Sequence, residues 1–310
     1  MEILFVIGFV LISCYICLSW FSSILILSPK SSLAISQELI RTDWNTSYEE
    51  MIKQLPKSTD FSISSFDGVK LRGKYFKSKK KAKSVIIGAH GWNGTWIEML
   101  KYIPALKDCS YDLVLYDHRS HGASDKAYPT GGVNEAKDLL AITEWVRKTT
   151  GVQNQQIGWL GSSWGGSTAL IAGATKINIG FIIADAPFQN WYSAIFERAQ
   201  REYGTWIKYL SISVMKIVDW RTGVNHQEAS PLLAAKKIKV PVLLIHSKMD
   251  ISTDAQQSVN ISKNLNTQSE FHHLNWGGGH TLDVVLHKEK FRTIVNDFLK
   301  RIDGPFLNDH

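Results

Sequence analysis

Cysteine is scarce in this sequence. The 310 residues contain three cysteines, and two of them, Cys14 and Cys17, lie in one apolar segment near the N-terminus. Cys109 therefore has no cysteine partner in the rest of the chain, which excludes a disulfide framework there. Outside the apolar segment the sequence has no C-x-x-C pair, and it has no H-E-x-x-H helix. Because these are common signs of a bound metal, we expect no metal, and no motif indicates a cofactor.

The surplus of one charge is small. The chain carries 35 Lys and Arg residues against 28 Asp and Glu, a formal net charge of +7 with a pI near 9.1. Part of the surplus is a lysine run between Lys77 and Lys83. We interpret this run as a solvated turn, with attraction to an acidic surface as the alternative. The remaining charge is scattered and no nucleic-acid-binding module is present, so we expect no nucleic-acid partner.

The most conspicuous feature that is present is a long apolar run. Ile3 to Leu27 includes no charged residue, and about 20 such residues are enough to cross a bilayer. The run is too long for a cleavable signal peptide and lacks the basic start of one. We therefore expect residues 1–28 to form a single-pass anchor that places the protein in a membrane. Because the run has no charge to pair with the body, we also expect the body to stay soluble and active without it.

After a polar connector over residues 29–58, strand and helix patterns alternate through residues 59–310. The predicted strands are Phe61–Phe66, Val69–Phe76, Ser84–Ala89, Tyr111–Tyr116, Ile157–Leu160, Ile179–Ala184, Val240–His246 and Phe271–Asn275. Asp67-Gly68 joins the first two as a hairpin with a two-residue turn. This alternation predicts an α/β domain whose sheet is mostly parallel and covered by helices on both faces.

The alternation stops between Pro187 and Lys239. Aromatic and aliphatic residues recur there at helical spacings, with no strand-like run. We therefore expect a small helical insertion over about residues 187–239, forming a cap above the carboxyl ends of the strands. Extra helices packed on the sheet edge are the alternative.

A short motif lies between a predicted strand and a helix of small residues. Gly161-Ser162-Ser163-Trp164-Gly165 matches the G-x-S-x-G pattern. In this context the pattern indicates a nucleophile elbow, a sharp turn that lifts the serine hydroxyl above the carboxyl ends of the strands. We expect a side chain at Gly161 or Gly165 to collide with a neighbouring strand or helix. Ser163 is the candidate nucleophile, and an ordinary Gly/Ser turn is the alternative.

A serine hydroxyl is a poor nucleophile at neutral pH, so it needs a base, and the base needs an orienting acid. His280 follows the last predicted strand behind three glycines and is the candidate base. Asp250 follows the preceding strand and is the candidate acid, in the chain order Ser, acid, His found on such sheets. Asp185, at the end of another strand, is the rival acid.

A tetrahedral intermediate also needs two hydrogen-bond donors for its oxyanion. We assign them to the backbone N–H of Trp164, next to the nucleophile, and to that of Trp92, in the loop after Ala89. We interpret His90 as bracing this loop, and Asp117–Ser124 as a hydrogen-bonded turn beside it.

These candidates follow one another in a set order along the chain: His90-Gly91-Trp92, Asp117-x-Arg119-x-His121-Gly122-x-Ser124, Gly161-x-Ser163-x-Gly165, Asp250 and His280. In this order they resemble the α/β-hydrolase superfamily over about residues 60–300, and most closely its Bem46-like and serine-aminopeptidase-like branch. The resemblance implies an eight-stranded, mostly parallel sheet, a Ser163–Asp250–His280 triad, and Trp92 and Trp164 as oxyanion donors. Ser120 departs from the branch, which usually has Gly there, and we expect it to fit with a negative φ.

The resemblance implies a serine hydrolase of the carboxylesterase or lipase type. We expect it to cleave a carboxylic ester or thioester of a small-molecule acyl substrate through an acyl-enzyme on Ser163. The tryptophan-rich insertion and the apolar run favour an apolar acyl group. An amidase or small-peptide peptidase with the same triad is the alternative. A third hypothesis, a non-catalytic binding protein on this fold, predicts a broken triad.

Overall fold

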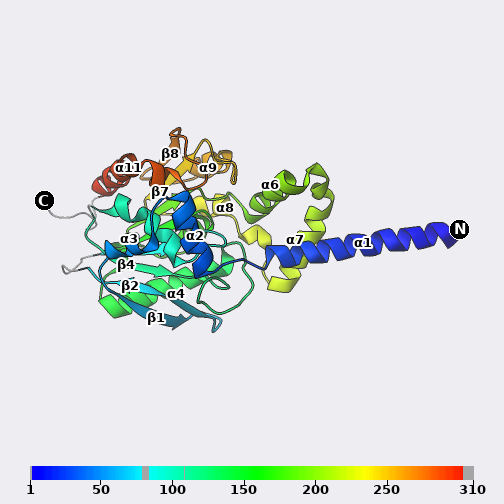
Figure 1. Ribbon diagram of the computed structural model, residues 1–310, viewed down its shortest axis with the longest axis horizontal. Helices are drawn as coiled ribbons and strands as arrows, with labels where there is room; N and C mark the ends of the chain where they lie inside the picture. The colour runs from blue at the N-terminus through cyan, green and yellow to red at the C-terminus, as the bar shows by residue number, and fades with distance from the viewer. Residues whose placement is uncertain (1, 79–83, 108, 303–310) are drawn as a thin grey trace.

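The computed structural model describes residues 2–78, 84–107 and 109–302; residues 79–83 of the expected lysine turn lie outside the described residues. An eight-stranded sheet in the order β1-β2-β4-β3-β5-β6-β7-β8 forms the body (Figure 1). Its strands are β1 (Ser58–Ser64), β2 (Lys70–Phe76), β3 (Val85–Ala89), β4 (Asp112–Tyr116), β5 (Ile157–Ser162), β6 (Phe181–Asp185), β7 (Val242–Ser247) and β8 (Glu270–Leu274). β2 is antiparallel to both of its neighbours, and all other pairs are parallel. The expected α/β-hydrolase architecture is confirmed.

Helices cover both faces of the sheet. Within β3, Ile86 packs into one apolar cluster and Ile87 into another, because successive strand residues point to opposite faces. The first cluster includes residues of α2 (Leu33–Asp43), η1 (Trp96–Leu106), α10 (Asp283–Leu286) and α11 (Lys288–Arg301), and the second includes residues of α4 (Val133–Thr150), α5 (Trp164–Gly173) and α9 (Gln256–Ser262). The remaining helices outside the predicted insertion are α1 (Glu2–Ile26), α3 (Tyr48–Lys53) and η2 (Asn154–Gln156). Burial on both sides explains why the central strands are almost entirely apolar.

The first hairpin has a longer turn than the sequence predicts. The Ser65 N–H donates to the Val69 carbonyl at 2.8 Å, and the Gly68 N–H donates back to the Ser65 carbonyl at 3.1 Å. The loop therefore has three residues between the bonded pair, and the expected two-residue turn is wrong. Gly68 has φ of 87°, a conformation that closes a three-residue loop and that glycine adopts without steric cost.

Between β6 and β7 the chain forms α6 (Trp191–Tyr203), η3 (Thr205–Ile207), α7 (Lys208–Thr222), η4 (His226–Glu228) and α8 (Pro231–Ala235). Local capping explains two of these helices. Asn190 accepts the Ser193 N–H at 2.8 Å to begin α6, and Ser230 caps α8, which has Pro231 in its first turn. In Figure 1, α6 and α7 stand away from the sheet on the side where α1 leaves the body. We refer to α6, η3 and α7 below as the cap; its boundaries as a separate unit stay a prediction.

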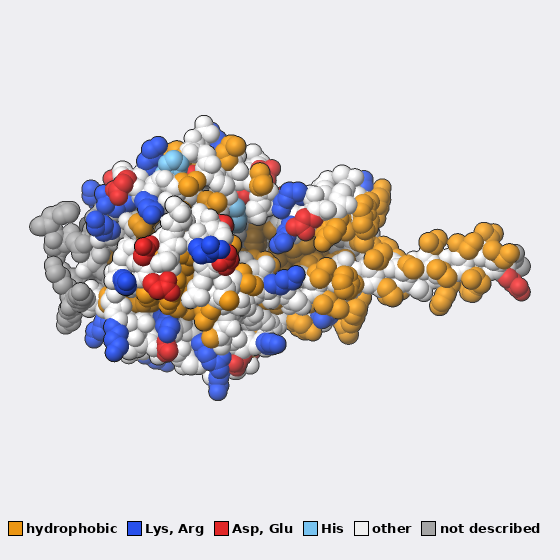
Figure 2. Space-filling view, in the orientation of Figure 1, with side chains coloured by type: hydrophobic (Ala, Val, Ile, Leu, Met, Phe, Trp, Pro, Cys, Tyr) orange, Lys and Arg blue, Asp and Glu red, His pale blue; other side chains and the backbone are white. Residues whose placement is uncertain are grey.

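α1 extends away from the body and exposes large apolar side chains along most of its length (Figures 1 and 2). Among the described residues it is the helix long and apolar enough to cross a membrane. Its last turns, however, lie along α7. Ser19 Oγ is 2.8 Å from Ser213 Oγ, and the Arg221 guanidinium donates to Ser23 Oγ at 3.0 Å. The run has no charge to pair with the body, as expected, but its hydroxyl groups supply contacts instead. The expectation that the body stays soluble and active without this segment stays a prediction.

Candidate active site

The predicted elbow joins β5 to α5. Ser163 has a positive φ of 51°, which a non-glycine residue rarely adopts, and its N–H donates to the Asp185 carbonyl at 2.7 Å. A Cβ atom on Gly161 would lie 2.4 Å from the Gly165 backbone, and one on Gly165 would lie 2.0 Å from the Ala89 carbonyl oxygen. The expectation that side chains at these glycines would collide is confirmed. The backbone of the turn is thus strained at Ser163. The turn can form because neither Gly161 nor Gly165 carries a side chain.

Three of the predicted site residues meet above the carboxyl ends of the strands. Ser163 Oγ lies 2.7 Å from His280 Nε2, and His280 Nδ1 lies 2.6 Å from Asp250 Oδ2. They come from the end of β5, the loop after β8 and the loop after β7. The Asp250 side chain is fully buried, whereas 26% of the His280 side chain is exposed. Both distances are those of direct hydrogen bonds, so a proton can pass from the hydroxyl to the imidazole.

Asp250 is held by more partners than the sequence reveals. Its Oδ1 accepts the N–H groups of Ser252 and Thr253 at 2.8 and 2.9 Å. A second imidazole, that of His246, reaches the same Oδ2 as His280 at 3.0 Å. Burial alone would raise the pKa of Asp250, but the hydrogen bonds from His246 and His280 outweigh it and hold the pKa well below its ordinary value. The acid is therefore ionised whenever the protein is folded near neutral pH.

His246 is a site residue that sequence reasoning missed. It lies in β7, four residues before Asp250, and its Nδ1 is 2.7 Å from Ser258 Oγ on α9. The available signal was a histidine directly after the buried apolar run Val242–Ile245, a polar group that must find hydrogen-bond partners when it is buried.

The rival acid has a different role in the structure. Asp185 Oδ2 accepts the Tyr102 hydroxyl at 2.7 Å, while its backbone carbonyl accepts the elbow N–H of Ser163. Burial raises the pKa of Asp185 above its ordinary value. The carboxylate bonded to the His280 imidazole is thus that of Asp250.

The two expected oxyanion donors flank Ser163. Trp164 is the first residue of α5, where backbone N–H groups have no acceptor within the helix. Trp92 follows Gly91, and a Cβ atom on Gly91 would lie 3.3 Å from Ser163 Cβ, so this loop passes directly over the elbow. The rings of Trp92 and Trp164 meet edge to face with centroids 4.9 Å apart. Their assignment as oxyanion donors stays a prediction.

A buried carboxylate ties the loop to the elbow, and the sequence did not indicate it. Glu98 accepts the Gly91 N–H at 2.9 Å and the Ser162 hydroxyl at 2.7 Å. The Lys101 ammonium donates to Glu98 at 3.0 Å and to Thr281 Oγ1, beside His280, at 2.7 Å. Burial alone would raise the pKa of Glu98, but the nearby Lys101 charge and the hydrogen bonds lower it to about 2. The pair thus connects three loops of the site.

The two structural interpretations near the loop are confirmed. His90 Nε2 accepts the His118 N–H at 3.0 Å and so braces the two loops against each other. Asp117 accepts the N–H groups of Trp96 and Ala123 at 2.7 and 2.8 Å, which closes the expected turn. Burial lowers the pKa of His90 below its ordinary value, so its ring is neutral and able to accept the bond.

The expected negative φ at Ser120 is wrong. Ser120 has φ of 63°, in the region of backbone conformation that favours glycine. Its N–H donates to the Asp125 carbonyl at 2.9 Å, and its hydroxyl accepts the Ala127 N–H at 3.0 Å and donates to the Ala127 carbonyl. These local bonds offset the cost of the left-handed backbone.

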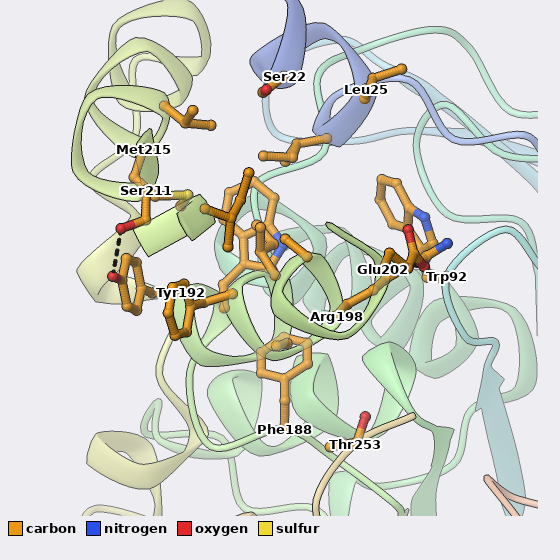
Figure 3. A pocket seen from close by; sticks show the side chains of 18 of the residues that line it. Ser22, Leu25, Trp92, Phe188, Tyr192, Arg198, Glu202, Ser211, Met215 and Thr253 are labelled. Atoms are coloured by element: carbon orange, nitrogen blue, oxygen red, sulfur yellow. Dashed lines mark hydrogen bonds and ion pairs between the residues drawn. The ribbon is translucent and has the colours of Figure 1, made fainter. Parts of the chain in front are cut away.

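A cavity of about 480 Å³ opens at Ser163, within the range of small-molecule sites. Figure 3 shows its walls: Leu25 of α1 lies above, Met215 of α7 to the side, and Phe188 and Tyr192 below. The Tyr192 hydroxyl bonds to Ser211 Oγ at 3.0 Å, which links α6 to α7 across the cavity wall. Most of the lining is apolar, and α1 contributes to it directly.

Comparison with known proteins agrees with this arrangement. The model of the prolyl oligopeptidase family matches residues 110–302, more than half of the chain. The chain belongs to the prolyl oligopeptidase family. It is therefore a hydrolase of the serine α/β-hydrolase type. Within this superfamily, the finer assignment to the Bem46-like and serine-aminopeptidase-like branch stays a prediction.

Individual relatives of this prolyl oligopeptidase family member are distant. The chain is 27% identical over 275 residues to the uncharacterized protein YqkD of Bacillus subtilis, covering 86% of this chain and 88% of YqkD. Among solved structures it resembles the Pyrococcus furiosus esterase Pf2001 with a TM-score of 0.66 at 23% identity, covering 83% of this chain and 94% of the esterase. It also resembles the Pyrococcus horikoshii acylaminoacyl peptidase with a TM-score of 0.58 at 22% identity, covering 82% of this chain but 43% of the peptidase. At these identities the structures share the fold.

Proposed function

We propose that this protein is a membrane-anchored esterase or thioesterase that acts through an acyl-enzyme on Ser163. The observation that carries the proposal is the continuous set of hydrogen bonds from Ser163 Oγ through His280 to Asp250, at 2.7 and 2.6 Å. A non-catalytic binding protein would require a broken triad, and here all three members are bonded. The apolar α1 supports the membrane location.

The reaction follows from this geometry. Ser163 Oγ attacks the acyl carbon while its proton passes to His280 Nε2, and the carbonyl electron pair moves onto the oxygen. Ionised Asp250 stabilises the imidazolium. When the carbonyl re-forms, the alkoxide or thiolate leaves and takes the proton from His280. Water then attacks the acyl-enzyme with His280 as base, releasing the carboxylic acid and restoring Ser163.

The oxyanion would be stabilised by the N–H groups of Trp92 and Trp164. Both belong to backbone segments held rigidly, by the Glu98 carboxylate on one side and by the start of α5 on the other. Donors that need no reorganisation are the most effective in stabilising a developing charge.

The lining of the cavity favours an apolar acyl group. Phe188, Trp191 and Ile195 line it beside Ser163, and desolvating an acyl chain against such side chains is favourable. The small-molecule acyl substrate would place its chain against these residues and its carbonyl at the elbow.

A peptidase or amidase is the second candidate, because the cavity lining also includes charges. Arg198 and Glu202 line it and lie 2.8 Å apart. A peptidase needs a charged group to hold a substrate terminus, and either residue of this pair could serve. When no charged substrate terminus is bound, Arg198 and Glu202 pair with each other. Ester hydrolysis therefore stays the first proposal.

The test combines a probe with two substrate series. We expect Ser163→Ala to abolish both fluorophosphonate labelling and hydrolysis, with a loss on the order of 10⁴-fold or more, while Ser162→Ala retains labelling. p-Nitrophenyl esters of increasing chain length should be cleaved much faster than aminoacyl anilides. Labelling that persists in Ser163→Ala would reject the nucleophile, and faster cleavage of the anilides would replace the esterase by the peptidase.

A further inference from the structure

We propose that the end of the cap inserts into the same membrane leaflet as α1, and that an acyl ester dissolved in the bilayer reaches Ser163 directly from that leaflet. The proposal rests on the proposed function and identifies its substrate class. The inserted surface, called the cap tip below, consists of Tyr203, Trp206, Tyr209 and Ile212.

The cap tip exposes large apolar side chains within ten residues of sequence. Tyr203 is 56% exposed, Trp206 50%, Tyr209 70% and Ile212 66%. Figure 2 shows hydrophobic side chains gathered over this end of the molecule and along α1, with some charged side chains of the cap among them. One of these charges is Lys208, whose ammonium lies 5.0 Å from the Tyr209 ring centroid at the end of a long, flexible side chain that can extend back toward the headgroups. A large apolar patch exposed to water is energetically unfavourable. Such a cluster therefore indicates a surface that is buried against another phase, here the membrane.

The contacts between α1 and α7 fix the position of the cap tip along the α1 axis. The Tyr15 hydroxyl donates to the Tyr209 carbonyl at 3.0 Å, and Ser19 meets Ser213 one turn further along both helices. The two helices therefore run in the same direction, and α7 begins beside Tyr15. The cap tip lies part-way along the segment that would cross the bilayer.

Helix geometry converts this position into a depth. A hydrocarbon core of about 30 Å corresponds to about 20 helical residues at 1.5 Å each. With Ile3 at the far edge of the core, its near edge falls at about Ser22, and Tyr15 lies about 10 Å inside it. An α1 that spans the bilayer therefore carries Tyr209, bonded to Tyr15, into the near leaflet.

An aromatic and basic cluster lies where this geometry places the headgroups. The rings of Trp20 and Trp220 are 5.8 Å apart, and the Arg221 guanidinium lies 5.3 Å from the Trp20 ring centroid. Tryptophan and arginine are the residues that favour the boundary between hydrocarbon and water. The cluster is thus consistent with the depth calculated from α1.

The cavity connects this surface to the nucleophile. Tyr203 both belongs to the exposed cap tip and lines the cavity that contains Ser163. On α7, Leu210 lines the cavity next to exposed Tyr209, and on α1 Ile26 lines it as well. An acyl chain can therefore pass from the leaflet between α1 and the cap without crossing water. The substrate class is a long-chain acyl ester or thioester resident in the membrane.

The first experiment measures insertion without using catalysis. The full chain with Cys14→Ser and Cys17→Ser is labelled with an environment-sensitive NBD dye at Ile212→Cys, or at Leu286→Cys on α10 as a control that is also exposed. In phosphatidylcholine vesicles we expect blue-shifted, brighter emission at position 212 and water-like emission at position 286. Water-like emission at both positions would overturn the proposal.

The second experiment tests substrate delivery. Trp206→Gln with Ile212→Gln removes two cap-tip side chains that do not line the cavity, and Leu233→Gln with Leu286→Gln is the matched control. We expect the cap-tip variant to keep soluble p-nitrophenyl butyrate turnover and to lose about tenfold on a long-chain 4-methylumbelliferyl ester dissolved in vesicles, since it loses apolar membrane contact. Equal losses on both substrates, or none, would reject delivery from the leaflet. A wild-type chain that cleaves neither substrate would instead reject the proposed function, and the NBD measurement would still decide insertion.

Discussion

Lys101 and Glu98 form an ion pair of 3.0 Å beneath the nucleophile elbow, and the Lys101 side chain is only 3% exposed. Glu98 holds the loop that carries Trp92, through the Gly91 N–H, and Lys101 holds the loop that carries His280, through Thr281. One pair of charges therefore fixes the position of two loops of the candidate site relative to the elbow.

Lys101→Met should strongly destabilise the protein, because it leaves the Glu98 carboxylate buried without its cation. We expect a loss of about 3–5 kcal/mol in the free energy of unfolding, measured by urea titration. Arg147→Met is the control, since Arg147 and Glu144 form an ion pair of similar length, 2.8 Å, with about half of each side chain exposed. That change should cost less than about 1 kcal/mol. Equal effects of the two substitutions would show that Lys101 is dispensable.

The same pair predicts a pH dependence in a defined window. The pKa of Glu98 is about 2 in the folded protein, against an ordinary 4.5. The folded pKa is depressed, so its stabilising contribution is fully present above pH 4.5 and is lost as the pH falls toward 2. The difference in unfolding free energy between wild type and Glu98→Gln should therefore shrink when measured at about pH 3 instead of about pH 6. A difference that stays constant over this range would contradict the assignment.

Asp250→Asn should reduce turnover by roughly 10⁴-fold, by analogy with the corresponding change in serine proteases, because the amide favours the wrong imidazole tautomer. Asp185→Asn should have a much smaller effect on turnover, since the Asp185 side chain is bonded to the Tyr102 hydroxyl, which an amide oxygen can also accept. Both variants are compared at matched folding by circular dichroism. If Asp185→Asn were the more damaging change, Asp250 would not be the acid.

Two truncations separate the anchor from the wall of the cavity. Deleting residues 2–18 removes most of the exposed run but keeps Ser23, Leu25 and Ile26, so hydrolysis of a soluble ester should continue within about twofold of wild type. Deleting residues 2–28 removes the cavity lining supplied by α1 and should lower kcat/KM by about tenfold, or about 1.4 kcal/mol. Equal activity of the two truncated chains would show that α1 serves only as an anchor.

Much of the fold was predictable because its signals are local. Apolar runs of strand length, helical spacings between them and the glycines of the elbow each act over a few residues, and they indicated the sheet, its covering helices and Ser163. The order Ser163, Asp250, His280 along the chain likewise followed from strand ends, because parallel strands bring their carboxyl ends to one edge.

What the sequence by itself determined was the architecture, the candidate nucleophile and base, and two rival carboxylates for the acid. Only the tertiary structure decided which carboxylate meets His280, that His246 shares Asp250, and that Glu98 and Lys101 support the elbow. The structure also shows that the end of α1 lines the cavity, whereas the sequence indicated only an isolated apolar run. The physical reason is that these are side-chain contacts between distant segments: Ser163 and His280 are 117 residues apart, and Lys101 and Thr281 are 180 apart. No local pattern encodes such a contact, because it forms only when packing of the whole sheet brings the loops together.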